Sequence, residues 1–304
     1  MSRLIPFLFM LVACRALAAN EPSLDELKTK ALAGDVLTQL QLGAKYDSGD
    51  GVRQNLKEAF KWYEMAAKAG NPVAQNNLGD FYLRGEGVKK DYAKALQFFQ
   101  DSFAQNKPPI SAAAACSIGL MYDSGFGVPK NPETANAWYL KAAEGGFARA
   151  MENLGLSYAQ GSGVEKDLAK ALQWYEKAAN LGLANAQLET GYHYYNGLGV
   201  EKDPVVAVAW YRKAAAQGDV KAMTNLGLAY RDGQGVPHNN IEAFAWLDLA
   251  RFLTQTGGYN LNVKWGIRGY FDELKKNMTK VETTAGEKRT KELEAELRAQ
   301  QMKN

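Results

Sequence analysis

The sequence predicts an all-α protein built from six tandem helix-turn-helix repeats that end in C-terminal capping helices. The first observation behind this prediction is self-similarity, because one multi-residue pattern recurs along most of the chain. The second is its spacing: successive anchor glycines are 36 residues apart in four intervals and 40 in one. These glycines are Gly43, Gly79, Gly119, Gly155, Gly191 and Gly227. Stacked repeats of this kind bury a continuous core that no single repeat can form alone.

Apolar and small residues at intervals of about four predict the first helix of each repeat. Five repeats place an alanine five residues before the anchor glycine, and most place an aliphatic residue directly before it. All six place a tyrosine three residues after it: Tyr46, Tyr82, Tyr122, Tyr158, Tyr194 and Tyr230. Residues at this spacing share one helical face. Glycine costs a helix roughly 1 kcal/mol relative to alanine, so we expect the anchor glycines to permit close approach of another helix.

A Gly-x-Gly-Val loop separates the two helices of each repeat. Glycine ends a helix in the left-handed conformation, and we expect the valine to contact the core. Three residues after each valine stands an Asn or Asp, the preferred residue at a helix start. These residues are Asn55, Asp91, Asn131, Asp167, Asp203 and Asn239. The second helix then carries aromatic side chains, and we expect Trp174 to be a large side chain buried between repeats.

The combined pattern, as in LGLSYAQGSGVEKDLAKALQWYEKAANLG (154–182), resembles the Sel1-like repeat, a relative of the tetratricopeptide repeat with a longer internal loop. The resemblance covers about residues 35–254 and implies a right-handed α/α solenoid. The expected repeats are 35–71, 72–111, 112–147, 148–183, 184–219 and 220–254. Residues 255–304 leave the pattern and resemble the capping helices that follow such arrays.

The second repeat departs from the pattern. It carries Phe98-Phe99, has Ser102-Phe103 in place of two alanines, and has Asn106 in place of a closing glycine. It also contains a four-residue insertion around Pro108-Pro109. We therefore expect the junction between the second and third repeats to be bent or loosened relative to the others.

The N-terminal residues 1–19 resemble an export signal peptide. A positive start at Arg3 precedes the apolar stretch Leu4–Ala13, and small residues offer cleavage sites after Ala18 or Ala19. An alternative is cleavage before Cys14, because Leu11-Val12-Ala13-Cys14 resembles the bacterial lipobox and would leave a lipidated cysteine. Ten apolar residues span only about 15 Å as a helix, too short to cross a membrane. Both alternatives predict an exported protein of the bacterial periplasm or cell envelope, with an outer-membrane lipoprotein as the second case.

The sequence offers no catalytic, metal or cofactor motif. Removing residues 1–19, which contain two arginines and no acid, lowers the net charge from +3 to +1, so we expect no nucleic-acid partner. The histidines His193 and His238 are far apart, and no Cys-x2-Cys or His-x3-His spacing occurs. No serine is followed three residues later by lysine, and Cys116 has no histidine beside it in the sequence. We predict no catalytic residues, no metal and no cofactor.

The family resemblance implies that the first helices line a concave groove for a partner. The face opposite the Ala–Leu–Tyr stripe carries the candidate partner-binding residues Asn77, Asp80, Arg84, Glu152, Asn153, Tyr192, Tyr195, Asn196, Asn225 and Arg231. Asn77, Asn153 and Asn225 share one repeat position. Related peptide-binding arrays use asparagine on the matching face to hold a partner's backbone or carboxylate, and the alternative is that these are ordinary surface residues. Tyr192 and Tyr195 are extra to the pattern, so we expect them to be exposed rather than needed for packing.

These observations predict a non-enzymatic scaffold or adaptor of the cell envelope that binds a protein or an extended peptide. A monomer without a transmembrane segment is expected. The alternative is a protein that binds the peptidoglycan cell wall or has penicillin-binding or β-lactamase-like activity, because cysteine-rich relatives have been described as penicillin-binding.

Overall fold

The computed structural model describes residues 22–256 and 261–302, which form fifteen α-helices and no strand. The predicted signal peptide and Cys14 lie outside the described residues. The chain divides between Ile110 and Ser111 into two compact units, here unit 1 and unit 2. This division falls between the second and third repeats, directly after the Pro108-Pro109 insertion. The predicted all-α class is confirmed.

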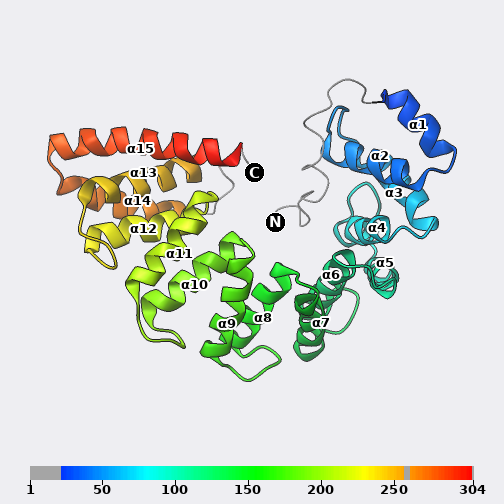
Figure 1. Cartoon of the computed structure of the whole chain (residues 1–304), viewed down its shortest axis with the longest axis horizontal. Coiled ribbons are helices and arrows are strands. Elements are labelled where there is room, and N and C mark those ends of the chain that lie inside the picture. The colour runs from blue at the N-terminus through cyan, green and yellow to red at the C-terminus, as the bar shows by residue number, and fades with distance from the viewer. Residues whose placement is uncertain (1–21, 257–260, 303–304) are drawn as a thin grey trace. The chain divides into compact units, whose positions relative to one another are not determined.

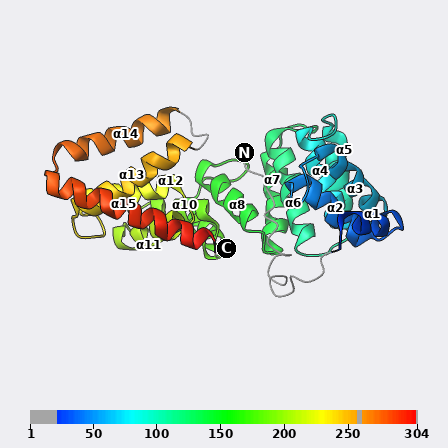
Figure 2. The same ribbon diagram turned by 90° about the horizontal axis from the view of Figure 1, so that it is seen from above.

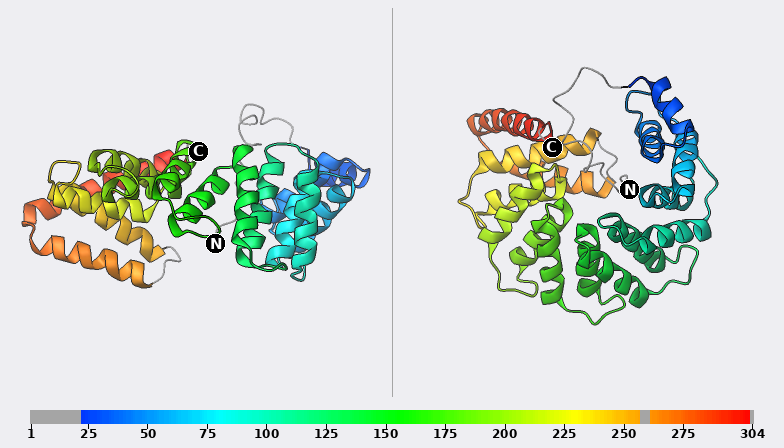
Figure 3. Two further views of the ribbon diagram at one scale, coloured as in Figure 1. Left: turned by 90° about the horizontal axis from the view of Figure 1, so that it is seen from below. Right: turned by 45° about the vertical axis from the view of Figure 1, so that its right-hand side comes forward.

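The first helix of each repeat is called the A helix and the second the B helix, and the two alternate along each unit (Figures 1 and 3). Unit 1 contains α1 (Leu24–Leu32), α2 (Val36–Ser48), α3 (Leu56–Lys68), α4 (Pro72–Arg84) and α5 (Tyr92–Ala104). Unit 2 contains α6 (Ile110–Ser124), α7 (Pro132–Glu144), α8 (Ala148–Gln160), α9 (Leu168–Asn180), α10 (Ala184–Asn196), α11 (Pro204–Ala216), α12 (Val220–Asp232), α13 (Asn240–Thr256), α14 (Leu261–Lys276) and α15 (Lys280–Gln301). The A helices are α2, α4, α6, α8, α10 and α12.

Side-chain caps begin the B helices where the sequence predicts them. The Asp167 carboxylate accepts a hydrogen bond from the Lys170 backbone N–H at 2.9 Å, and Asn239 accepts from Ile241 and Glu242. The same arrangement occurs at Asn55, Asp91, Asn131 and Asp203. Each cap satisfies a backbone N–H that has no partner within the helix, so the six caps fix where the B helices start.

The anchor glycines allow each A helix to lie directly against the B helix of its own repeat. A Cβ added at Gly155 would lie 2.6 Å from the ring of Tyr175, and one at Gly191 would lie 2.6 Å from Tyr211. The other four anchor glycines meet Tyr63, Phe99, Tyr139 and Leu247 at similar distances. The predicted reason for these glycines, close helix–helix approach, is therefore confirmed.

A second set of glycines connects neighbouring repeats through the loops. A Cβ at Gly199 would collide with the backbone of Leu168, the first residue of the B helix in the preceding repeat. The corresponding contacts join Gly87 to Leu56, Gly163 to Pro132 and Gly235 to Pro204. Each of these glycines also has a positive φ, which L side chains rarely adopt. Each of these four loops therefore rests on the start of the preceding B helix.

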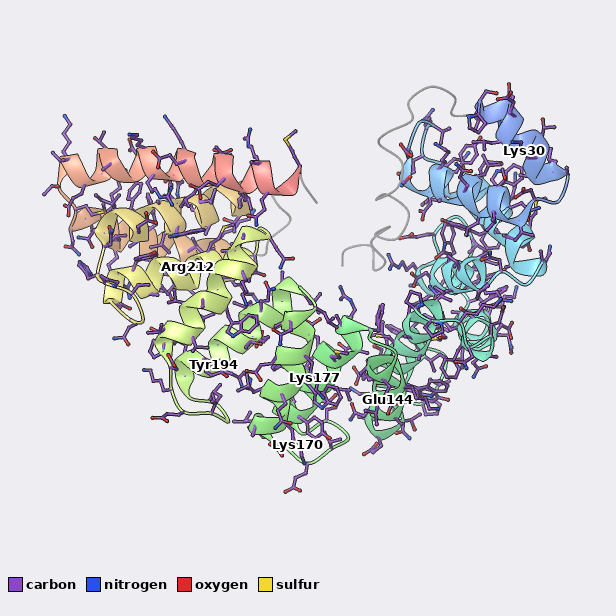
Figure 4. All side chains as sticks on the ribbon, viewed as in Figure 1. Lys30, Glu144, Lys170, Lys177, Tyr194 and Arg212 are labelled. Carbon is purple, nitrogen blue, oxygen red and sulfur yellow. The ribbon has the colours of Figure 1, made fainter. Side chains whose placement is uncertain are left out.

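Tyrosine hydroxyls add polar contacts between repeats. Tyr194 donates a hydrogen bond to Glu176 Oε1 at 2.8 Å, and Arg212 Nη2 donates to the Tyr230 hydroxyl at 2.8 Å (Tyr194 and Arg212 are labelled in Figure 4). In both pairs the tyrosine lies on an A helix and its partner on the B helix of the preceding repeat. In the fifth and sixth repeats the tyrosine at this position therefore joins its A helix to the preceding repeat through its hydroxyl.

The two ends of the array are covered differently. At the C-terminal end, α13 lies between α14 and α15 (Figure 2), and Gly286 of α15 allows the ring of Phe244 to approach closely. At the N-terminal end the single short helix α1 packs against Leu42 and Trp62. Gln39 donates to the carbonyl of Ala31 in α1, as Gln187 donates to Ala179 in α9. Helix α1 thus takes the place of the C-terminal half of a B helix.

The expectation that Trp174 is buried between repeats is wrong. Its indole ring is only half-buried and lies under the ammonium group of Lys177, at 4.0 Å from Nζ to the ring centroid (Figure 4 labels Lys177). The neighbouring Tyr175 is 2% exposed and fills the space beside Gly155 instead. Adjacent residues on a helix point about 100° apart, so only one member of the aromatic pair can face the A helix.

In the described parts of the chain, no helix is both long enough and apolar enough to cross a lipid bilayer.

Candidate functional site

The ten predicted partner-binding residues all lie on A helices, and the two units divide them. Helix α4 of unit 1 carries Asn77, Asp80 and Arg84. In unit 2, α8 carries Glu152 and Asn153, α10 carries Tyr192, Tyr195 and Asn196, and α12 carries Asn225 and Arg231. We call the side of α8, α10 and α12 that bears these residues the A face.

In unit 1 the charged candidates interact with each other. The Arg84 guanidinium lies 3.7 Å from the Asp80 carboxylate, one helical turn away, and both side chains are 24% exposed. Burial raises the pKa of Asp80 to about 6, against the opposing effect of Arg84. Glu86 and Asp47 raise this pKa further because their negative charges repel the carboxylate. Asp80 therefore carries an incompletely compensated charge.

The repeated asparagine position, two residues before the anchor glycine, faces a buried tyrosine of the preceding repeat. Asn225 interacts with the side chain of Tyr211, which is 1% exposed. Asn77 lies in the same way beside Tyr63, also 1% exposed. Among the described residues the buried Tyr63 hydroxyl has no hydrogen-bond partner, so Asn77 packs beside this phenol without bonding to it. Asn77 and Asn225 thus pack against the preceding repeat, a role that neither interpretation of this position from the sequence predicts.

On α8, both candidates contact neighbouring repeats. Asn185 of α10 donates a hydrogen bond to Glu152, and Asn153 contacts the sulfur of Cys116 at 3.9 Å from Nδ2 to Sγ. Burial raises the pKa of Cys116 to about 12, so its thiol stays protonated at neutral pH. A buried, protonated thiol is a poor nucleophile.

A pocket of about 400 Å³ lies between α10, α12 and α14, at the end of the A face. Its walls are the apolar and aromatic residues Leu188, Tyr192, Val263, Ile267 and Tyr270, together with Gly266. Its polar lining consists of Glu189, Lys221, Thr224 and Asn225. Tyr192 is 48% exposed and Tyr270 is 40% exposed. Of the ten predicted residues, only Tyr192 and Asn225 line this pocket.

Tyr195 and Arg231 are engaged within the fold. The ring of Tyr195 packs against the core 6.4 Å from that of Tyr211, so the expectation that Tyr195 is not needed for packing is wrong. The reason is that Tyr195 lies one helical turn after Gly191, on the side of α10 that packs on Tyr211, and burial also raises the pKa of Tyr195. Arg231 forms an ion pair with Asp232 at 2.7 Å and lies 4.0 Å from Glu273 of α14. Asn196 donates to the backbone carbonyl of Tyr192.

Sequence reasoning missed several residues of the pocket. Glu189 occupies the repeated asparagine position of its own repeat, and a position-by-position comparison of the repeats would have found it. Val263, Ile267 and Tyr270 share one face of α14 at spacings of four and three, which is a visible amphipathic signal. What the sequence could not supply is the packing of α14 beside α12 and α13, which brings this face to the pocket.

The histidines have structural contacts. His193 is 3% exposed, its Nδ1 lies 2.8 Å from the Leu198 carbonyl, and its ring packs edge-on to Tyr175. Burial lowers the pKa of His193, against the opposing effect of the hydrogen bond to Leu198, and so favours the neutral imidazole. Among the described residues, no group of three or more His, Cys, Asp or Glu side chains is arranged to hold a metal ion.

A comparison with the models of known protein families finds one that matches this chain. The family model described as Sel1 repeat matches six segments, 36–71, 72–106, 112–147, 148–183, 184–219 and 220–251, which together cover more than half of the chain. No curated protein matches the chain.

Among the solved structures that resemble this chain over most of its length are two Sel1 repeat proteins with TM-scores of 0.67 or more. A Sel1 repeat protein from Oxalobacter formigenes is 38% identical, with a TM-score of 0.68, over 76% of this chain and 91% of that protein. A protective antigen present in uropathogenic Escherichia coli strains, which displays the same repeat fold, is 26% identical with a TM-score of 0.67. That match covers 90% of this chain and 64% of the antigen.

Proposed function

Because this chain belongs to the Sel1 repeat family, we propose that it is a non-enzymatic scaffold that binds another protein, or an extended peptide, on the A face of unit 2. Sel1 repeat proteins generally mediate protein–protein interactions. The observation that supports this location is the open pocket beside α14, where the exposed aromatic side chains Tyr192 and Tyr270 flank polar groups.

The chemistry of this surface suits a protein partner. Large aromatic residues surrounded by polar groups are typical of the few side chains that provide most of the free energy of a protein interface. Leu156 of α8 occupies the same repeat position as Tyr192 and is also exposed, so apolar contact area continues along the A face. The partner would thus contact both α8 and α10.

The test is capture of partners by the purified protein from an envelope extract, with identification by mass spectrometry. Tyr192→Ala removes an exposed aromatic side chain, and we expect it to reduce capture by roughly tenfold or more while leaving the melting temperature nearly unchanged. Leu140→Ala is the matched control, because Leu140 is exposed to a similar extent on a B helix. Unchanged recovery by the folded Tyr192 variant would place the interface elsewhere.

We place the protein in the bacterial envelope on the basis of residues 1–19. Labelling of cells with a clickable palmitate separates the two processing alternatives. Label that is lost in Cys14→Ala supports a lipoprotein, whereas an unlabelled mature protein that begins after Ala18 or Ala19 supports a free periplasmic protein. A mature protein that retains residues 1–19 contradicts both.

Binding of cell-wall glycan is the second candidate function. The combination of exposed tyrosines and the Asn225 amide in one pocket also suits a sugar ring, which stacks on aromatic faces and hydrogen bonds to amides. Sedimentation with purified peptidoglycan distinguishes the two functions. Cosedimentation that Tyr192→Ala abolishes favours the glycan, and capture of a protein without cosedimentation favours the scaffold.

A further inference from the structure

The pocket beside α14 contains a carboxylate without a direct partner. Glu189 is half-buried, and within the described parts of the chain no hydrogen bond or salt bridge engages its side chain. Burial is the main cause that raises the pKa of Glu189, and the neighbouring Glu152 and Asp219 raise it further. Lys221 opposes these effects from across the pocket. A partly desolvated carboxylate of this kind is stabilised by any cation that reaches it.

The surroundings of Glu189 also suit the carbon chain of such a cation. Leu188 and Ile267, both 4% exposed, provide an apolar base, and Tyr192 and Tyr270 offer aromatic surface at the opening. Aliphatic stems of lysine and arginine pack well on apolar surface, and their charged groups are attracted to aromatic faces. The positive charge of Arg231, near Tyr270, is offset by Asp232 and Glu273.

We propose that this pocket binds a lysine or arginine side chain of the partner, with the charged group at Glu189 and the stem against Tyr192, Ile267 and Tyr270. This inference rests on the proposed function and adds the chemistry that the site recognises. A purely apolar occupant would bury Glu189 further without compensating its charge, and an acidic occupant would be repelled by Glu189, Glu152 and Asp219. A basic side chain satisfies both the charge and the apolar walls.

Methyl NMR provides a direct test, because isoleucine is rare in this chain and Ile267 lines the pocket. Protein labelled at isoleucine methyl groups is titrated with blocked pentapeptides Gly-Gly-X-Gly-Gly, where X is Arg, Lys, Glu, Leu or Phe. We expect the Arg and Lys peptides to shift the Ile267 signal and leave that of Ile118, which is buried in the third repeat. Equal or larger shifts with the Leu, Phe or Glu peptide would overturn the proposal.

Variants of the charged residues in the pocket test whether it prefers a positively or a negatively charged ligand. Glu189→Gln keeps the shape of the side chain and removes its charge, so we expect the Arg peptide to bind roughly five- to tenfold more weakly. Lys221→Met removes the competing cation, so we expect tighter binding of the same peptide. A ligand recognised through its negative charge would show the opposite order, and an unchanged dissociation constant for Glu189→Gln would refute a role of this carboxylate.

Two glycines of α14 provide a substitution that blocks the pocket and a matched control, and neither should disturb the fold. At both Gly266 and Gly269 an added Cβ meets no atom within 4 Å, but only Gly266 lines the pocket. Gly266→Leu is expected to abolish the peptide-induced shift of Ile267, and Gly269→Leu is expected to leave it. Both variants should retain or raise the melting temperature, because leucine favours a helix over glycine.

Capture of the natural partner separates this inference from the proposed function. Loss of capture in Gly266→Leu together with normal capture in Glu189→Gln would retain the pocket as a binding site and overturn the basic occupant. Normal capture in both Gly266→Leu and Tyr192→Ala would overturn the proposed location of binding as well. Loss of capture in Gly266→Leu and Glu189→Gln, with Gly269→Leu unaffected, supports both.

Discussion

At the scale of single residues, the adjacent tryptophan and tyrosine of a B helix differ in how deeply they are buried. Tyr175 is buried against Gly155, whereas Trp174 is half-buried beneath Lys177. The same division recurs at Trp138 and Trp210, whose rings lie 4.1 Å and 3.7 Å from the ammonium groups of Lys141 and Lys213. The stability of the third, fourth and fifth repeats therefore depends more on the tyrosine of each pair than on the tryptophan, whereas in the first repeat Trp62 is also buried, against α1.

A matched pair of substitutions tests this difference. Tyr175→Ala removes a fully buried ring and is expected to lower the free energy of unfolding by about 3–5 kcal/mol. Trp174→Ala removes a ring that keeps part of its solvent contact and a cation–π contact, so the expected loss is about 1–2 kcal/mol. Urea denaturation monitored by circular dichroism measures both. A larger loss for Trp174→Ala would contradict the assignment of the core.

The raised pKa of Asp80 predicts that the free energy of unfolding of unit 1 depends on pH. Its folded-state pKa of about 6 lies above its ordinary value of 3.8, so the folded state binds the proton more tightly. The resulting stabilisation is complete below pH 3.8 and is lost as the pH rises through about 6. At pH 7.5, Asp80→Asn should therefore raise the free energy of unfolding by about 1–2 kcal/mol, since it removes a poorly solvated charge.

Urea denaturation of the whole protein between pH 4 and pH 8, followed at unit 1, tests this prediction for Asp80. The advantage of Asp80→Asn is expected to disappear near pH 4, where wild-type Asp80 is largely protonated. Asp50→Asn serves as the control, because the Asp50 side chain is 80% exposed. A constant difference between Asp80→Asn and wild type at all pH values would show that this carboxyl does not titrate as expected.

At the scale of elements, replacing a glycine within a helix raises or lowers stability according to what lies beside it. Gly191 lies against the ring of Tyr211, whereas Gly269 faces open space. Gly191→Ala is expected to lower the free energy of unfolding by about 1–3 kcal/mol, because the A and B helices must separate. Gly269→Ala should raise it by up to about 1 kcal/mol through helix propensity. Thermal denaturation of both variants checks the signs, and two changes of the same sign would contradict the explanation.

The sequence predicted the elements well and the site incompletely. Helix starts, loop glycines and anchor glycines follow from backbone chemistry that repeats in every copy, so each copy supports the assignment of the others. The orientation of Trp174 and Tyr175 depends on which one faces the A helix, and periodicity alone does not distinguish adjacent residues. The pocket requires α14, whose place beside α12 follows from tertiary packing outside the repeated pattern.

At the scale of the whole molecule, contacts in a repeat array run mainly between neighbours, so damage should remain local. Tyr63→Ala is expected to accelerate hydrogen exchange in α1–α4, and Tyr211→Ala should do so in α10–α13. Exchange mass spectrometry of both variants measures the extent of each effect. A uniform loss of protection along the chain after either substitution would indicate a single cooperative unit instead.

The asymmetry of the two ends has a consequence for how such a protein can be lengthened. Gly51 holds the loop position of Gly87, Gly163, Gly199 and Gly235, but an added Cβ there meets only the Lys45 side chain, at 3.8 Å. Among the described residues, no B-helix start lies on this loop, and residues around it line an open pocket with Leu24 and Tyr46. The first repeat thus retains the loop surface that the second, fourth, fifth and sixth repeats place on the preceding B helix. A B helix stacked before the first repeat would find the loop at Gly51 open and would have only α1 to displace, whereas one stacked after the sixth repeat would have to displace both α14 and α15.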